Sequence, residues 1–141
     1  MSQEELSFIS TLEGLTGALA IDCIWEKEDN RVIFIVRRND TGKVIGRGGT
    51  TIQRLREHFK KNIEVVEYSE KIEKFVSNTL APAKTKNVEI IEKTDGKTVI
   101  VTVLQREKGK AIGKNGRNIQ RSRLLLKRHF GVKNVIIQCP N

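Results

Sequence analysis

Two short glycine-containing segments carry a basic residue in a setting that suits phosphate binding. Gly46-Arg47-Gly48-Gly49 and Gly113-Lys114-Asn115-Gly116 both follow the pattern Gly-x-x-Gly. Glycine permits a tight turn and the close approach of another backbone. A helix that starts directly after such a turn presents free N–H groups and the positive end of its dipole, which is a natural seat for phosphate. Because a lone Gly-x-x-Gly is usually a plain turn, the functional interpretation depends on the sequence around it.

That surrounding sequence is duplicated. Residues 42–54 and 109–121 are identical at eight of thirteen positions, at a constant offset of 67. His58-Phe59 recurs as His129-Phe130, at an offset of 71, so the second copy has about four extra residues, or one helical turn, after the shared core. The chain is therefore a tandem repeat of units near 70 residues. We expect a first domain over residues 1–68 and a second over 69–141.

The first copy is expected to contain three helices and three strands. Ser2 followed by Glu5 resembles a capping box, and the apolar spacing after it suits an amphipathic helix. The polar segment 28–30 separates two β-rich runs, which predicts a hairpin. The expected elements are a helix over 3–20, strands over 21–27 and 31–37, a short helix over 40–45, a longer helix over about 50–60 and a strand over 63–68.

The second copy repeats this order. Pro82 ends its first helix, and Asp95-Gly96 is a strong hairpin signal. The expected elements are a helix around 72–79, strands over 87–92 and 97–104, a short helix ending at Ile112, a helix ending near residue 130 and a strand over 134–138. Each copy therefore reads αββααβ, which predicts an α+β protein with two three-stranded sheets, each packed on helices.

Positive charge gathers around the two glycine segments. The 141 residues carry a net charge of +9. Residues 37–61 hold eight basic and two acidic residues, and residues 105–133 hold ten basic residues and one acidic residue. These two zones carry +6 and +9, so the rest of the chain is −6. Solvated helix faces would explain basic residues alone, but an anionic polymer as ligand also explains why acids avoid both zones.

The composition excludes several classes of protein. Apolar residues make up 38% of the chain, which suits packed cores rather than disorder, and no apolar run is long enough to span a membrane. The N-terminus lacks the basic start and apolar stretch of a signal peptide, so we expect a cytoplasmic protein. Only seven residues are aromatic, which argues against a module that stacks bases on aromatic side chains.

No residues suggest catalysis, a metal or a cofactor. His58 and His129 occupy matching positions, but a metal site needs further ligands, so helix capping or packing is the better interpretation. Cys23 lies between apolar neighbours and is expected to be buried, while Cys139 is close to the C-terminus. The sequence shows neither a nucleotide-binding loop with its lysine and hydroxyl residue nor a catalytic triad.

The residues Val44-Ile45-Gly46-Arg47-Gly48-Gly49 and Ala111-Ile112-Gly113-Lys114-Asn115-Gly116, set in αββααβ order, resemble the core of tandem type II KH domains. The length and the two-unit layout resemble the archaeal NusA-like transcription factors. The resemblance covers nearly the whole chain. It implies a non-catalytic factor that binds single-stranded RNA, with each glycine loop clamping about four nucleotides. RNA polymerase is a second partner that the resemblance implies.

The resemblance also suggests which residues touch RNA. The glycine loops would clamp the backbone, basic side chains would reach phosphates, and four isoleucines would line the floor of the groove or else pack in the core. The full set is Lys43, Ile45, Gly46, Arg47, Gly48, Gly49, Ile52, Arg54, Lys110, Ile112, Gly113, Lys114, Asn115, Gly116, Arg117, Ile119 and Arg121.

Two functional classes remain open at this point. The first is an RNA-binding factor in transcription elongation, antitermination or termination. The second is an RNA-processing or ribosome-assembly factor that uses tandem KH domains. The partners that the protein captures would separate the two classes.

Overall fold

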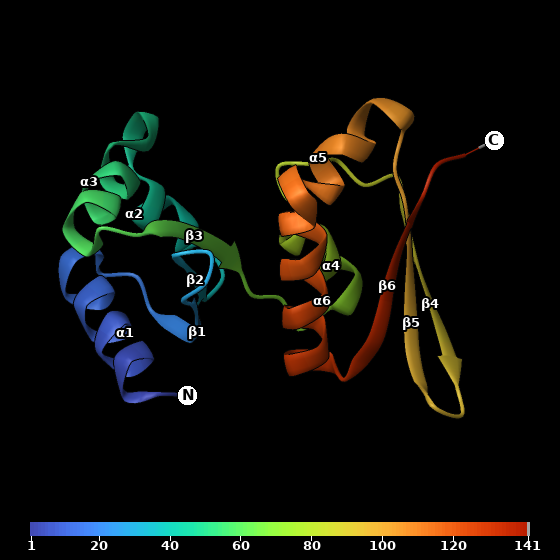
Figure 1. Cartoon of the computed structure of the whole chain (residues 1–141), viewed down its shortest axis with the longest axis horizontal. Coiled ribbons are helices and arrows are strands. Elements are labelled where there is room, and N and C mark those ends of the chain that lie inside the picture. The colour runs from blue at the N-terminus through green and yellow to red at the C-terminus, as the bar shows by residue number, and fades with distance from the viewer. Residues whose placement is uncertain (141) are drawn as a thin grey trace. The chain divides into compact units, whose positions relative to one another are not determined.

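A computed structural model describes residues 1–140 of the chain. The chain divides into two compact units, Met1–Ser69 and Glu70–Asn141, called unit 1 and unit 2 below. Each unit holds one three-stranded sheet and three α-helices (Figure 1). The α+β class and the order αββααβ in both units are therefore confirmed. No helix in the described part of the chain is both long and apolar enough to cross a membrane.

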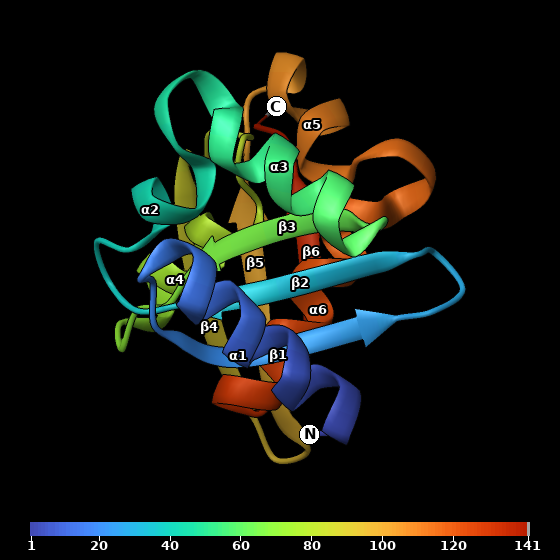
Figure 2. The ribbon, with the colours of Figure 1, turned by 90° about the vertical axis from the view of Figure 1, so that its left-hand side faces the viewer.

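In unit 1 the helices cover one face of the sheet (Figure 2). The strand order is β1-β2-β3, with β1 antiparallel and β3 parallel to the central β2. Val32, Phe34 and Val36 of β2 alternate onto the helix side and join Leu12 in the core. The elements are α1 (Gln3–Thr16), β1 (Ala20–Glu26), β2 (Arg31–Val36), α2 (Thr41–Ile45), a 3₁₀ turn (Arg47–Gly49), α3 (Thr50–Phe59) and β3 (Asn62–Glu67).

Unit 2 repeats this topology with one longer helix. The strand order is β4-β5-β6, again antiparallel then parallel. The helix α6 has 14 residues against 10 in α3, which confirms the extra helical turn predicted from the repeat. The elements are α4 (Ile72–Thr79), β4 (Asn87–Lys93), β5 (Gly96–Thr102), a 3₁₀ turn (Gln105–Glu107), α5 (Lys108–Ile112), a second 3₁₀ turn (Lys114–Gly116), α6 (Arg117–Phe130) and β6 (Val132–Gln138).

The ends of the first helix follow local sequence rules. Ser2 and Glu5 form both hydrogen bonds of the predicted capping box. The helix ends at Thr16, not near residue 20 as expected, because Gly17 adopts the left-handed conformation and its N–H binds the carbonyl of Glu13. The apolar residue Leu19 therefore lies beyond the helix.

A buried carboxylate anchors the short helix of each unit. Asp40 precedes α2, and its Oδ2 accepts the backbone N–H of Leu19 at 2.8 Å, just before β1. Glu107 occupies the matching position before α5, 67 residues later, and its Oε1 accepts the N–H of Lys84 at 2.8 Å, shortly before β4. Each carboxylate therefore ties the start of the first strand to the helix that leads into the glycine loop.

These contacts favour the ionised form of both acids. The N–H of Leu19, helped by hydrogen bonds from Arg37 and Lys43, lowers the pKa of Asp40 below its ordinary value of 3.8 against the opposing effect of burial. The N–H of Lys84, helped by Lys110, lowers the pKa of Glu107 below its ordinary value of 4.5 against the same effect. A lowered folded-state pKa contributes stability that is full above the ordinary pKa and is lost as the pH falls through the folded-state pKa.

We therefore expect acid to loosen both units through these two groups. Urea unfolding of the wild-type protein should show a midpoint that falls as the pH drops from about 6 to about 3. The variant with Asp40→Asn and Glu107→Gln should unfold at lower urea at pH 7 and show a smaller decrease over the same range. Glu28→Gln and Glu92→Gln, at exposed positions, provide the matched control. An unchanged midpoint in the Asp40 and Glu107 variant at pH 7 would contradict the anchoring role.

Candidate nucleic-acid interface

The two glycine loops have the same backbone conformation. Gly46 has φ 74° and ψ 171°, and Gly113 has φ 78° and ψ 166°. The third loop position is left-handed in both units, with φ 63° at Gly48 and 58° at Asn115. Asparagine is one of the few other residues that adopt this conformation readily, so unit 2 keeps the geometry without a glycine there.

The first glycine of each loop has no room for a side chain. A Cβ atom on Gly46 would collide with Oγ1 of Thr51 and lie 2.8 Å from the backbone nitrogen of the same residue. A Cβ atom on Gly113 would lie 2.8 Å from Cγ and 2.9 Å from the backbone nitrogen of Asn118. The loop therefore brings the end of the short helix directly against the first turn of the longer one.

The longer helices begin with the features of an anion seat. Gly49 and Gly116 are the N-caps of α3 and α6, and neither provides a side-chain cap for the first turn. The first turn of each helix contains no acidic residue. The N–H of the first residue is already bonded in the preceding 3₁₀ turn, from Thr50 to the carbonyl of Arg47 and from Arg117 to that of Lys114. The following N–H groups and the positive end of the helix dipole are therefore the features suited to phosphate oxygens.

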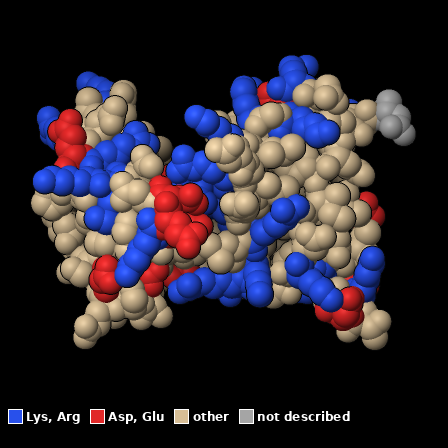
Figure 3. Space-filling model, viewed as in Figure 1, with Lys and Arg blue, Asp and Glu red and all other residues tan. Residues whose placement is uncertain are grey.

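Exposed basic residues flank both seats. Arg47 and Lys114 lie within the loops and are exposed, and Arg54 is exposed on α3. Arg117 is half-buried at the start of α6. Lys43 and Lys110 are about half exposed, and their amino groups lie 3.4 Å and 3.6 Å from the anchoring carboxylates of Asp40 and Glu107. Lys and Arg atoms outnumber those of Asp and Glu on the face of the molecule drawn in Figure 3.

The four isoleucines fall into two groups. Ile45 is 37% exposed and Ile112 is partly exposed, so both keep surface beside the loops. Ile52 and Ile119 are only 9% and 8% exposed and belong to the interior of their units. Core packing, the alternative interpretation, therefore accounts for Ile52 and Ile119.

Arg121 corrects an expectation, because it is buried rather than available to phosphate. It is 6% exposed, and its guanidinium donates to the carbonyl of Thr79 at 2.8 Å and 3.0 Å and to that of Ala81 at 2.8 Å. These carbonyls lie at the end of α4, where they need donors. The matching Arg54 stays exposed, so identical residues of the repeat differ in role.

A second matching pair of arginines was not identified from the sequence. The side chain of Arg56 donates to the carbonyl of Ile63 at 3.2 Å, and that of Arg123 donates to the carbonyl of Val135 at 3.2 Å and 3.3 Å. Ile63 and Val135 lie on the edge strands β3 and β6, and their backbone carbonyls point away from the neighbouring strand. The two arginines therefore cover part of an open sheet edge. Their offset of 67, the same as for the other matched residues of the repeat, is the sequence signal that could have identified them.

The histidines and cysteines show packing roles. His58 meets Phe59 edge to face at 5.4 Å, and His129 meets Phe75 edge to face at 5.8 Å between ring centroids. Cys23 is buried, as expected, and Cys139 is half-buried. Across residues 1–140, no group of three or more His, Cys, Asp or Glu side chains is arranged to hold a metal ion.

Comparison with known proteins defines the class of both units. Residues 10–70 match the model of the KH domain, and residues 72–138 match the model of the NusA-like second KH domain. The glycine loop between two helices, set against a three-stranded sheet, is thus part of a KH domain in each unit.

Full-length relatives then define the family. A protein named "Probable transcription termination protein NusA" in Halococcus morrhuae is 36% identical over 136 residues, which cover 96% of this chain and 95% of the relative. Its namesake in Methanocaldococcus jannaschii is 30% identical, covering 100% of this chain and 76% of the relative. A solved structure titled "Crystal structure of APE1850" is 43% identical with a TM-score of 0.86, covering 98% of this chain and 100% of that one. The chain belongs to the NusA-like family of tandem KH-domain proteins.

The loop geometry predicts different effects for neighbouring glycines. Gly46→Ala should lower the free energy of unfolding by at least about 1–3 kcal/mol, because only glycine adopts this conformation readily and the added methyl group meets Thr51. Gly42→Ala, in the same short helix, meets nothing within 4 Å and should be neutral or stabilise by up to about 1 kcal/mol. Urea titration measures both. Equal stability of the two variants would show that the loop relaxes without cost.

Proposed function

We propose that this protein is a non-catalytic single-stranded RNA-binding factor that acts in transcription termination or antitermination. Its two RNA-binding domains are residues 1–68 and 69–141. The observation that carries the proposal is the pair of glycine loops with equal backbone geometry, each holding an exposed basic residue and followed by a helix whose first turn contains no acid. The names of the archaeal relatives support a role in transcription rather than in RNA processing or ribosome assembly.

The contacts with RNA follow from the exposed residues of each unit. The loops Gly46–Gly49 and Gly113–Gly116 let the RNA backbone approach the helix N-termini. Arg47, Lys114, Arg54 and Arg117 add charge around the phosphates, and Lys43 and Lys110 reach them from the short helices. Ile45 and Ile112 offer apolar surface to bases beside the loops. Such contacts position an RNA strand without chemical change, in a factor that acts beside RNA polymerase in the cytoplasm.

Acidic loops should abolish RNA binding while the fold persists. The variant Arg47→Asp, Gly48→Asp, Lys114→Asp and Asn115→Asp places like charge against phosphate and should weaken binding of an eight-nucleotide single strand by about tenfold or more. Gly48 has open space around it, and aspartate tolerates the left-handed conformation, so circular dichroism should be unchanged. Fluorescence anisotropy with labelled RNA measures the affinity.

A charge-matched variant separates the loops from net charge. Lys27→Glu, Lys93→Glu and Lys97→Glu change the total charge by the same six units, away from the loops. This control should retain most of the affinity at 150 mM salt, where the Debye length is about 8 Å. Wild-type affinity in the loop variant, or equal losses in both variants, would refute the loop assignment.

Single strands should be preferred to duplex. The loops are suited to bind the backbone of a strand whose bases are unstacked, whereas the deep major groove of an A-form helix excludes side chains. A single-stranded octanucleotide should therefore compete at least about fivefold better than the matched duplex for bound, labelled RNA. Tighter binding of the duplex would indicate another mode of recognition.

A further inference from the structure

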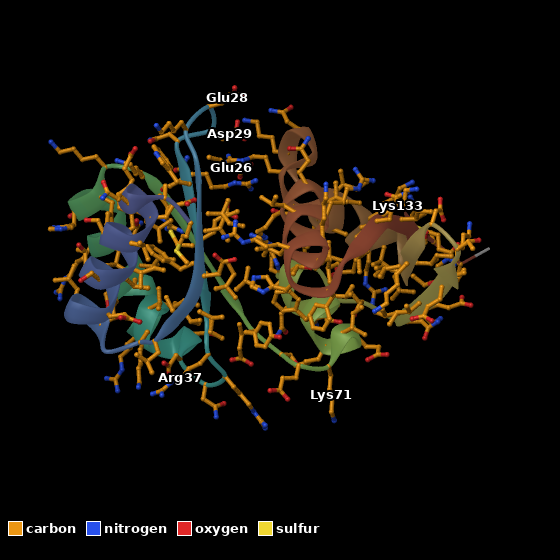
Figure 4. All side chains as sticks on the ribbon, turned by 90° about the horizontal axis from the view of Figure 1, so that it is seen from below. Glu26, Glu28, Asp29, Arg37, Lys71 and Lys133 are labelled. Atoms are coloured by element: carbon orange, nitrogen blue, oxygen red, sulfur yellow. The ribbon has the colours of Figure 1, made fainter. Side chains whose placement is uncertain are left out.

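Unit 2 has a cavity away from its glycine loop. It is a shallow depression, open to solvent, where the α4 helix meets the start of β4, with a volume of about 460 Å³. Lys71, at the N-cap of α4, projects from this side of the unit (Figure 4). The residues that line the cavity are Lys71, Glu73, Lys74, Ser77, Thr85, Lys86, Asn87 and Val88.

The lining of this cavity is basic. It holds three lysines and one glutamate, and Lys74 and Lys86 are both exposed. In unit 1, a cavity of similar volume, about 490 Å³, lies at the N-terminal end of α1 and the β1–β2 turn, where Figure 4 labels Glu26, Glu28 and Asp29. That cavity is acidic, with the lining Ser2, Glu4, Glu5, Trp25, Glu26, Lys27, Glu28 and Asp29.

The hydroxyl and amide groups between the lysines can donate hydrogen bonds to a ligand. The hydroxyls of Ser77 and Thr85 are 2.8 Å apart and join α4 to the segment before β4. Only one of the two hydroxyl hydrogens is needed for that bond, so the other can be donated to a ligand. The amide of Asn87 adds two N–H donors. Ammonium, hydroxyl and amide donors together suit the oxygens of a phosphodiester.

The position of the cavity separates it from the glycine loop. β4 and β6 are opposite edges of the sheet, with β5 between them, so the two edges are about 10 Å apart at least. The arginine that covers the outer edge of β6, Arg123, belongs to the helix that follows the loop. A strand that occupies only the loop, about four nucleotides, does not need the β4 edge.

We propose that the cavity formed by α4 and β4 is a second phosphodiester-binding site, which holds RNA that extends beyond the segment clamped by the loop of unit 2. Lys74 and Lys86 bind the phosphates, and the Ser77–Thr85 pair and Asn87 donate hydrogen bonds to their oxygens. This inference rests on the proposed RNA-binding function and adds a length requirement to it, because only RNA that is longer than the loop segment engages both sites.

The test measures how substitutions at two pairs of lysines change the affinity for a long and a short RNA. The variant Lys74→Gln and Lys86→Gln should bind 30-nucleotide oligouridine at least fivefold more weakly than wild type and bind the eight-nucleotide oligomer equally well. The slope of log K against log salt for the long RNA should become shallower by about 1.4, since two phosphate contacts are lost and each contributes about 0.7 on a single strand. Lys93→Gln and Lys97→Gln, at the far end of the β4–β5 hairpin, are the control and should leave both affinities unchanged.

Amine acetylation locates the contact directly. Bound 30-nucleotide RNA should protect Lys74 and Lys86 from acetylation, as measured by mass spectrometry, and should leave Lys93 and Lys97 reactive. Wild-type binding of the long RNA by the Lys74 and Lys86 variant, or no protection, would overturn the second site. Loss of binding to a polyglutamate peptide with unchanged RNA binding would also overturn it, in favour of an acidic protein partner.

The two proposals fail in different ways. If the acidic-loop variant binds the octanucleotide like wild type, the loop assignment fails, whatever the lysine variants do. If that variant loses binding while Lys74→Gln and Lys86→Gln change nothing with the long RNA, the proposed function stands and the second site is rejected.

Discussion

The first glycine of each loop imposes the constraint on which the rest of the interface depends. At Gly46 and Gly113, a positive φ and an extended ψ turn the chain so sharply that a Cβ atom would collide with the next helix. This close approach places the loop and the first turn of the following helix on one small surface. A side chain at either position would push the two helices apart, and the basic residues of the loop would no longer flank the same anion seat.

The anchoring carboxylates support this turn from the other side. A helix of five residues is too short to be stable alone, so α2 and α5 must be held by contacts with the rest of their units. Asp40 and Glu107 supply one such contact by binding a backbone N–H that precedes the first strand. The acids differ in length by one methylene group but make the same bond. The contact, rather than the identity of the residue, is therefore what the two units share.

The sequence was sufficient to predict the fold but not to predict which of the basic side chains are buried. The offset of 67 and the turn residues predicted the order of elements, because a repeat that keeps its loops also keeps its topology. Periodicity could not separate Arg54 from Arg121, since both follow the loop at the same distance. Arg121 is buried because carbonyls at the end of α4 lie within its reach, and these contacts come from residues 42 and 40 positions away. Burial of this kind depends on tertiary packing, which local patterns do not encode.

The two units share a backbone but differ in charge, and we expect this difference to give them different roles in binding RNA. Unit 2 has Arg117 where unit 1 has Thr50, and the start of its first helix carries two lysines and one acid, whereas the first turn of α1 carries two acids. Charge that is spread over several phosphates adds affinity without sequence information. Unit 1 instead has Gly48 and Thr50 around its loop, and these small residues allow the RNA backbone to lie closer. Because close approach favours contact with bases, we expect sequence selectivity to reside mainly in unit 1 and general retention of the strand in unit 2.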